Sequence, residues 1–335
     1  MIAIAIFNNK GGVGKTTFLC NLAAFIKKSL NKKVLVIDAD PQCNATIYLV
    51  KEQTVFEVYT KKKHLTVDFF FDSLRKGKGY LKGSVSPIFS PRFEVDLIPG
   101  DPKLALSEDL LASDWKIGTS GDPRGLQTTF VFRDMLGRFQ NYDYVFFDVG
   151  PSLGAINRSV LISSDFFLMP MSSDIFSLMA ISNISLSLTK WKKGLEKGLN
   201  DYEADESEPF EVNEKAVSWR LEFIGYVSQQ YTAKTVKGQR QPVKAYEHII
   251  KKAPKLIEKE LIKKFSSLPL GTNYNLGEVP YLHSVVPLSQ SANAPIFDLK
   301  ARDGVVGSHF GKVTDAQKIY QTIANNLMNN IRRKS

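Results

Sequence analysis

A glycine-rich turn close to the start of the chain limits the possible folds more than any other feature of this sequence. The turn, with the sequence NKGGVGKTT, covers Asn9 to Thr17. An apolar run from Ile2 to Phe7 predicts a strand before it, and apolar residues at helical spacing follow it up to Leu30. Glycines let backbone N–H groups converge on an anion without interference from Cβ atoms, and a helix N-terminus adds a favourable dipole. We therefore expect a phosphate-binding loop between the first strand and the first helix of an α/β domain.

The order Gly-Lys-Thr at the end of this turn has the spacing of a P-loop. In such a loop Lys15 faces the β- and γ-phosphates of a nucleotide, and Thr16 faces Mg²⁺. No Asn-Lys-x-Asp motif for guanine is apparent, so ATP is favoured over GTP. ATP and Mg²⁺ are therefore the expected cofactors. The predicted nucleotide contacts of the loop are Lys10, Gly11, Gly12, Val13, Gly14, Lys15, Thr16 and Thr17.

Aspartates follow two further predicted strands. The aliphatic run Val34 to Ile37 leads into Asp38 and Asp40, and the run Tyr144 to Phe147 leads into Asp148. Carboxyl ends of parallel strands face the crevice where α/β sheets bind ligands. Asp38 and Asp148 are therefore predicted metal residues, acting through bound water, and Asp40 is predicted to orient the attacking water. The alternative is that one of the two residues Asp38 and Asp40, with Asp38 favoured, only caps the turn that follows.

An ordinary P-loop makes no demand on the residue before its first glycine, which here is Lys10. The pattern KGGVGKTT resembles the deviant Walker A motif of the ParA/MinD family of P-loop ATPases. In that family the first lysine reaches across a nucleotide-sandwich dimer to the phosphates of the partner, as an arginine finger does elsewhere. The resemblance thus implies an ATP-dependent homodimer in which Lys10, Lys15 and Asp40 are the catalytic residues.

Two later segments resemble the switches of that family. Asp38 to Thr46, DADPQCNAT, resembles switch I, and Asp148 to Gly154, DVGPSLG, resembles switch II, which is usually DxPPSLG. Gly150 departs from this pattern. Its N–H, which proline lacks, could donate to the γ-phosphate, and its flexibility loosens the loop. The departure therefore bears on the rate of hydrolysis more than on nucleotide binding.

The resemblance continues to the end of the chain. Glu278 to Leu282 occupies the place of the strand end that packs on adenine in the family, with Tyr281 where an arginine is usual. Pro280, Tyr281 and Leu282 are therefore predicted base contacts. Ser289 to Asp298, SQSANAPIFD, resembles the segment before the last helix, which we expect from about 315 to 331.

The fold class implied by the resemblance is α/β, with a doubly wound, mostly parallel sheet of seven or eight strands and helices on both faces. We expect a single ParA-like domain over residues 1–335, with insertions at about 50–92 and an acidic loop at about 198–218. The helix before that loop is expected from about Ile175 to Leu195. The acidic segment itself is predicted to be exposed, and disorder is one of the options for it.

The net charge of +10 suggests a polyanionic partner, either nucleic acid or an acidic membrane surface, although a basic surface alone is the simpler reading. Basic residues alternate with aromatic ones between Lys61 and Lys82, where burial of Phe69, Phe70, Phe71 and Tyr80 is favoured over nucleic-acid contacts. A second basic segment has an apolar face and leaves its lysines for solvent or DNA. Its lysines are Lys251, Lys252, Lys255, Lys259, Lys263 and Lys264.

By resemblance the function is that of a partition ATPase for a plasmid or chromosome. Such an ATPase binds DNA of any sequence as an ATP dimer, and a centromere-binding or adaptor protein stimulates its otherwise slow hydrolysis. One alternative is a MinD-like positioning ATPase, which needs a C-terminal amphipathic membrane helix. The asparagine-rich end of the chain, followed by Arg332, Arg333 and Lys334, disfavours it. A ParA-like component of another system, such as a defence operon, would share all these motifs.

Two cysteines, Cys20 and Cys43, provide neither a disulfide framework nor the spacing of a metal site. They also do not match the cluster-binding positions of nitrogenase-iron-protein-like relatives. We expect a cytoplasmic protein, and a nucleoid-associated one if DNA is bound. The apolar N-terminal run is too short to span a membrane, so no membrane span is expected.

Overall fold

The structure is a computed structural model that describes residues 1–60, 65–172, 174–231, 233–236, 239–242, 252–282 and 284–334. Within these residues, eight strands form one sheet in the order β10-β7-β6-β1-β5-β2-β4-β3. Neighbouring strands are parallel except β3 and β4, which are antiparallel. The predicted seven- to eight-stranded, mostly parallel sheet is therefore confirmed. The strands are β1 (Ile2–Ile6), β2 (Val34–Asp38), β3 (Ile88–Ser90), β4 (Val95–Ile98), β5 (Tyr144–Asp148), β6 (Phe166–Ser172), β7 (Glu222–Tyr231) and β10 (Asn275–Pro280).

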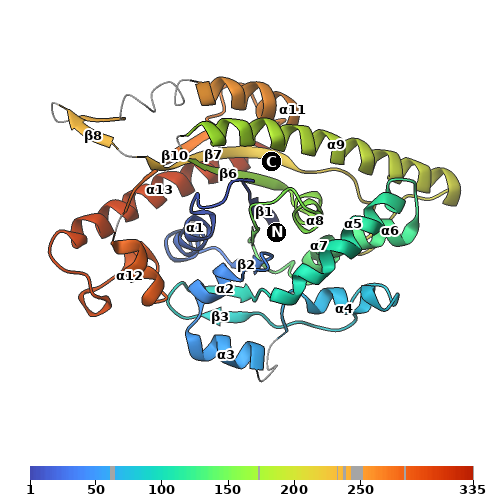
Figure 1. Ribbon diagram of the computed structural model, residues 1–335, viewed down its shortest axis with the longest axis horizontal. Coiled ribbons are helices and arrows are strands. Elements are labelled where there is room, and N and C mark those ends of the chain that lie inside the picture. Colours follow the sequence, from blue (N-terminus) through green and yellow to red (C-terminus); the bar gives the residue numbers. More distant parts are fainter. Residues whose placement is uncertain are drawn as a thin grey trace.

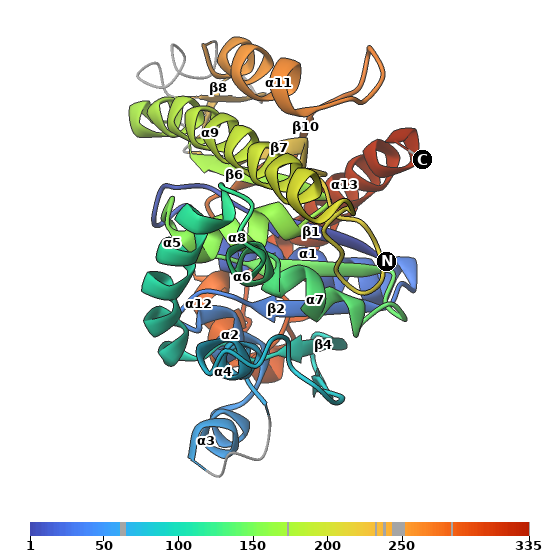
Figure 2. The same ribbon diagram turned by 90° about the vertical axis from the view of Figure 1, so that its right-hand side faces the viewer.

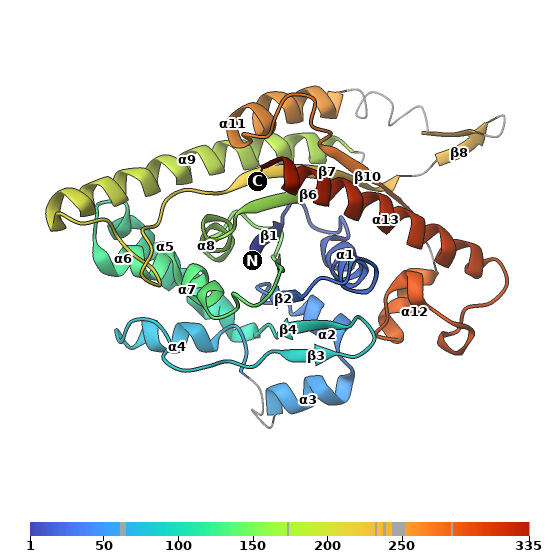
Figure 3. The same cartoon turned by 180° about the vertical axis from the view of Figure 1, so that it is seen from behind.

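Helices cover both faces of this sheet (Figure 1 and Figure 3). The central strand β1 shows why, because its side chains alternate between two hydrophobic clusters. Ile4 and Ile6 pack with α1 (Lys15–Leu30) and α13 (His309–Lys334), whereas Ala3 and Ala5 pack with α7 (Val131–Gly137) and α8 (Ala155–Ser163). Strands that are apolar on both faces need such cover. Other α-helices of the described residues are α2 (Asn44–Leu49), α5 (Ser107–Gly118), α6 (Pro123–Thr129) and α12 (Val285–Ser291).

Helix α9 (Ile175–Glu206) is longer than the sequence indicated. It was expected to end near Leu195, but it continues through the first part of the predicted acidic loop. Figure 1 shows its far end beside α5 and α6. Gly198 makes this possible, since a Cβ there would overlap the carbonyl oxygen of Gly118 in α5. The expectation of a loop was therefore wrong for residues 198–206, which are helical because this glycine contact packs the helix. The predicted exposure is confirmed for the acidic side chains of this segment from Glu203 to Glu214.

The segment between α2 and β4 adds α3 (Glu52–Thr60) and α4 (Phe69–Arg75) at the edge of the molecule, as Figure 2 shows for α3. Phe70 and Phe71 are buried, and the ring of Phe71 packs edge-on against Phe132 of α7. The predicted burial of the aromatic side chains is confirmed for these two residues, whereas Phe69 and Tyr80 are half-buried. Lys61, Lys62 and Lys63 lie outside the described residues.

The described residues also form several short elements. They are η1 (Pro102–Leu106), the pair β8 (Ala233–Val236) and β9 (Gln239–Pro242), the π-helical turn η2 (Glu258–Ile262), α11 (Lys263–Phe265), η3 (Ile296–Asp298) and η4 (Ala301–Asp303). Among the helices of the described residues, none combines the length and apolar character needed to cross a membrane.

Candidate nucleotide-binding site

The phosphate-binding loop connects β1 to α1 at the carboxyl end of the sheet. Gly12 and Gly14 have φ angles of 73° and 75°, a left-handed conformation that glycine adopts without steric cost. Gly14 is also the N-cap residue of α1. Beside the loop lies a cavity of about 530 Å³. It is lined by Gly11, Gly12, Val13, Gly14, Lys15, Thr16, Thr17, Asp40, Gln42, Asn44, Ile47, Tyr48, Pro151 and Gln290.

Lys15 is buried, and its Nζ donates a hydrogen bond to the carbonyl oxygen of Lys10 at 3.2 Å. Burial lowers the pKa of the Lys15 ammonium, although the nearby carboxylates of Asp148 and Asp40 act in the opposite direction. An anion in the adjacent cavity would stabilise the charged form of this partly desolvated ammonium. The position therefore suits the phosphate contact expected of Lys15.

Asp148 and Thr16 form the candidate metal position. Thr16 Oγ1 donates to Asp148 Oδ2 at 2.7 Å, whereas the buried Asp148 Oδ1 has no hydrogen-bond partner among the described residues. Burial, and next the charge of Asp38, raise the pKa of Asp148 well above its usual value. Asp38 lies opposite Asp148 in the register of β2 and β5. An unpaired buried oxygen and two adjacent carboxyl groups fit a hydrated Mg²⁺, which prefers oxygen ligands.

Asp38 has an additional structural contact. Its Oδ2 accepts hydrogen bonds from Thr46 N at 2.8 Å and Thr46 Oγ1 at 2.6 Å, and its Oδ1 accepts from Asp40 N at 3.3 Å. Burial raises the pKa of Asp38 to about 7. Asp38 therefore holds the turn that begins α2, as the capping alternative proposed. Its role at the metal stays a prediction.

Asp40 lines the cavity, and Gly150 lies next to it. Asp40 Oδ1 accepts from Gln42 N at 3.1 Å. A Cβ on Gly150 would lie 3.3 Å from the same oxygen, which is tighter than most contacts of this kind. The glycine that departs from the family pattern thus leaves room for the carboxylate at this point.

Lys10 has its side chain directed to α9 of its own chain. Lys10 Nζ donates to Ser172 Oγ at 2.9 Å and forms an ion pair with Asp174, the N-cap residue of α9. Burial opposes ionisation of Asp174, but the hydrogen bonds from Lys10 and Ser172 outweigh it and lower its pKa. The predicted contact of Lys10 with the phosphates of a partner subunit would require this ion pair to open.

The residues predicted to contact adenine do not line this cavity. Pro280 ends β10, and Leu282 is buried in the core. Their contact with the base stays a prediction.

Sequence reasoning did not select six of the residues that line the cavity. Four of these six belong to the segments that resemble motifs of the ParA/MinD family. The six residues are Gln42, Asn44, Ile47, Tyr48, Pro151 and Gln290.

The segment after α12 joins the C-terminal part of the chain to this site. Asn293 Nδ2 donates to the carbonyl oxygens of Ile47, Tyr48 and Val50 at 2.9, 3.1 and 3.1 Å, next to the end of α2. Asn21 Oδ1 of α1 accepts from Ile296 N at 2.7 Å. These contacts fix the segment that follows Gln290 and α12 against both α1 and α2.

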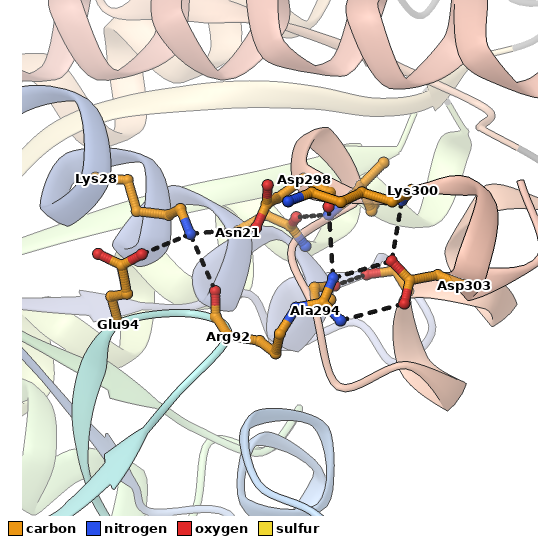
Figure 4. Close-up of polar contacts among 10 residues, drawn as sticks. Asn21, Lys28, Arg92, Glu94, Ala294, Asp298, Lys300 and Asp303 are labelled. Carbon is orange, nitrogen blue, oxygen red and sulfur yellow. Dashed lines mark hydrogen bonds and ion pairs between the residues drawn. The ribbon is translucent and has the colours of Figure 1, made fainter.

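Ion pairs extend this connection away from the cavity (Figure 4). Lys28 of α1 pairs with Glu94 at 2.8 Å and with Asp298 at 3.2 Å. Arg92 binds Asp303 through both guanidinium Nη atoms, at 3.1 and 2.9 Å. Bidentate pairs of this type are among the stronger charge-assisted contacts. The segment from Asn293 to Asp303 is therefore held at both ends.

Comparison with known proteins agrees with this geometry. Residues 1–200, more than half of the chain, match the family model AAA_31, described as an AAA domain. The chain belongs to this AAA domain family. The chromosome-partitioning ATPase Soj of Thermus thermophilus is 29% identical over 194 residues, which are 57% of this AAA_31 chain and 63% of Soj. The alignment thus spans less than two thirds of that relative. Together with the family match, it confirms the expected likeness to ParA-type ATPases.

Solved structures show the same fold. Protein DIP2308 from Corynebacterium diphtheriae is 29% identical to the AAA_31 chain, with a TM-score of 0.73 and coverage of 88% of this chain and 97% of that one. An ATP complex of a McdA variant from Cyanothece is 17% identical, with a TM-score of 0.61 and coverage of 98% and 96%. At 17% identity, the likeness to the second structure concerns the fold.

Proposed function

We propose that this AAA_31 protein is a ParA-type ATPase that hydrolyses ATP to ADP and phosphate with Mg²⁺, slowly unless a partner stimulates it. The observation that carries the proposal is the convergence of Lys15, Thr16 and Asp40 on one cavity, beside the unpaired buried oxygen of Asp148. A phosphate-binding loop alone would support only nucleotide binding. A carboxylate in the same cavity supports hydrolysis as well.

In the proposed reaction, the glycine-rich loop and Lys15 hold the phosphates, and Asp40 orients the attacking water. Phosphoryl transfer depends mainly on such positioning and on electrostatic stabilisation. Thr16 and Asp148 would hold Mg²⁺, with Asp38 beside them. When bound, the ion would neutralise charge that develops on the phosphoryl oxygens. Lys10 would complete the site of a second subunit after leaving Asp174, which makes hydrolysis dependent on dimerisation.

DNA binding and partition are the finer part of the proposal. Lys252 and Lys255 are exposed on the helical segment before η2. Lys259, Lys263 and Lys264 are offset by ion pairs with glutamates of the same segment. A basic surface of this kind supports contacts to phosphates without regard to sequence. Lys251 lies outside the described residues.

Both cysteines are buried and unpaired, which fits the proposed location in the reducing cytoplasm.

MinD-like positioning, or a role in another system, would use the same nucleotide site. The discriminating measurement is ATP-dependent binding of DNA by the wild-type protein. Absence of such binding at low salt, with ATP hydrolysis intact, would favour a positioning ATPase.

The ATPase itself is tested by replacing Lys15 with alanine. The loop then lacks its ammonium at the terminal phosphates, so ATP binding should fall below detection by equilibrium titration. Lys32→Ala, at an exposed position just after α1, is the matched control and should bind ATP normally. Undiminished affinity in Lys15→Ala would show that the nucleotide site is misassigned.

A further inference from the structure

Helix α8, which follows the switch II loop (Asp148–Gly154), receives its N-terminal cap from a distant part of the chain. Its own N-cap residue is Gly154, which makes no side-chain cap. Glu108, in the first turn of α5, accepts hydrogen bonds from Ala155 N through Oε1 and from Ile156 N through Oε2, the latter at 3.0 Å. A carboxylate at this position satisfies two otherwise free N–H groups and complements the helix dipole.

The absence of a Cβ at Gly154 is what admits this carboxylate. A Cβ placed there would collide with Glu108 Oε1. The φ and ψ angles of Gly154 are −78° and −177°, which any residue can adopt. Backbone conformation therefore does not require the glycine, whereas the approach of Glu108 does.

A second contact fixes α5 and α8 to each other close to the cap. Arg158 Nη2 donates to the carbonyl oxygen of Leu111 at 2.8 Å, and its guanidinium lies 4.5 Å from the ring centroid of Trp115. Such a stacked arginine adds a cation–π contribution. The first turn of α8 is thus attached to α5 on two sides.

The switch II loop connects this anchor to the nucleotide cavity. Asn157 of α8 donates through Nδ2 to Gly150 O at 2.8 Å and to Ser152 O at 2.7 Å. Pro151 lines the cavity, and its Cγ would lie 3.8 Å from a Cβ on Gly11 of the phosphate-binding loop. Gly150 also lies next to Asp40. The placement of α8 therefore determines where the loop meets the phosphate-binding loop and the proposed water-orienting carboxylate.

We propose that Glu108 is a positioning residue for ATP hydrolysis, which holds switch II in place by capping α8 from α5. This inference rests on the proposed ATPase function. Glu108 does not line the nucleotide cavity and is not a catalytic residue. Its loss releases the α8 end of the loop, while the β5 end stays held by the sheet and the phosphate-binding loop is untouched. ATP binding is therefore retained and turnover falls.

The test compares Glu108→Gln, which keeps one acceptor oxygen, with Glu108→Ala, which keeps none. Glu108→Ala should lower kcat about fivefold, the factor that corresponds to one helix cap, and Glu108→Gln should lower it less. The dissociation constant for ATP should stay within about twofold of wild type. Asp109→Asn, at the exposed neighbouring position of the same turn, is the control and should leave both quantities unchanged.

Gly154→Ala provides an independent test, since its methyl group should displace Glu108 from the cap. It should lower kcat as Glu108→Ala does, and the double variant should be hardly slower than either single one, because both remove the same contact. Additive effects would overturn the proposal. So would wild-type turnover in Glu108→Ala.

Amide hydrogen exchange separates this proposal from the ATPase assignment. Ala155 and Ile156 should lose protection about fivefold in Glu108→Ala, whether or not turnover is measurable. If the wild type does not hydrolyse ATP but these amides lose protection, the ATPase function fails and the cap remains. If turnover is normal in the wild type and protection does not change in the variant, the positioning role of Glu108 is wrong.

Discussion

Lys10 of the phosphate-binding loop forms an ion pair with Asp174, which is also the N-cap residue of α9. The two residues are 164 positions apart in the sequence. The pair keeps the proposed trans-acting lysine on its own subunit, next to Ser172. Opening of this pair is therefore a cost that dimerisation must overcome under the proposed function.

Weakening this ion pair should favour the ATP dimer. Asp174→Asn and Asp174→Ser both keep a side chain that can cap α9. Neither retains the negative charge that pairs with the ammonium of Lys10. Each should dimerise with ATP at a lower protein concentration than wild type. The factor is about 30, because the symmetric dimer opens two such contacts, each worth about 1 kcal/mol. Sedimentation or size exclusion at graded concentrations measures this. Weaker dimerisation in both variants would indicate that Asp174 supports the dimer instead.

Asp40→Ala should retain ATP but hydrolyse it slowly. Binding relies on the phosphate-binding loop, with Thr16 and Asp148 at the proposed metal position, whereas the attacking water loses its carboxylate. Removal of such a group commonly lowers turnover about 100-fold or more. Size exclusion with ATP should show the dimer persisting where the wild type returns to monomer. Wild-type turnover in Asp40→Ala would remove Asp40 from the water-orienting role.

The buried Asp38 should make the nucleotide-free protein less stable as the pH rises. Its pKa is raised by burial from 3.8 to about 7, so the folded protein keeps a proton that the unfolded chain loses. This contribution is fully present below the unfolded pKa and is lost as the pH rises through about 7. As the pH rises from about 4 to about 7, the free energy of unfolding of wild type should therefore fall relative to that of Asp38→Asn. Urea titration at each pH measures this difference. A difference that does not vary with pH would contradict the raised pKa.

Replacing Lys252 and Lys255 with glutamate should weaken binding to all DNA sequences alike. The logarithm of the DNA-binding constant falls linearly with the logarithm of the salt concentration. Each lysine lost from a phosphate contact makes this negative slope less steep by about 0.9. Lys263, which pairs with Glu258 at 3.3 Å, supplies the control, since Lys263→Ala should change the slope less. ATP turnover without DNA should be unaffected. An unchanged slope in the double variant would place the DNA contact on another surface.

Short-range spacing alone determined the phosphate-binding loop. Glycines at fixed offsets between a strand and a helix allow few conformations, so the places of Lys15 and Thr16 followed directly. The aspartates after β2 and β5 were also predictable, because parallel strands in one sheet end at the same edge. For the same reason, the continuous apolar strands indicated a sheet covered on both faces.

Contacts between distant segments were decided only by the tertiary structure. Nothing local in the sequence shows that Asp174 binds Lys10, that Glu108 caps α8, or that Asn293 reaches the end of α2. Each of these contacts depends on how helices are placed on the sheet, which many side chains set together. The length of α9 was missed for the same reason, since its extension depends on the close contact of Gly198 with Gly118. Local propensity determines which elements form, whereas packing over long sequence separations decides which side chains meet.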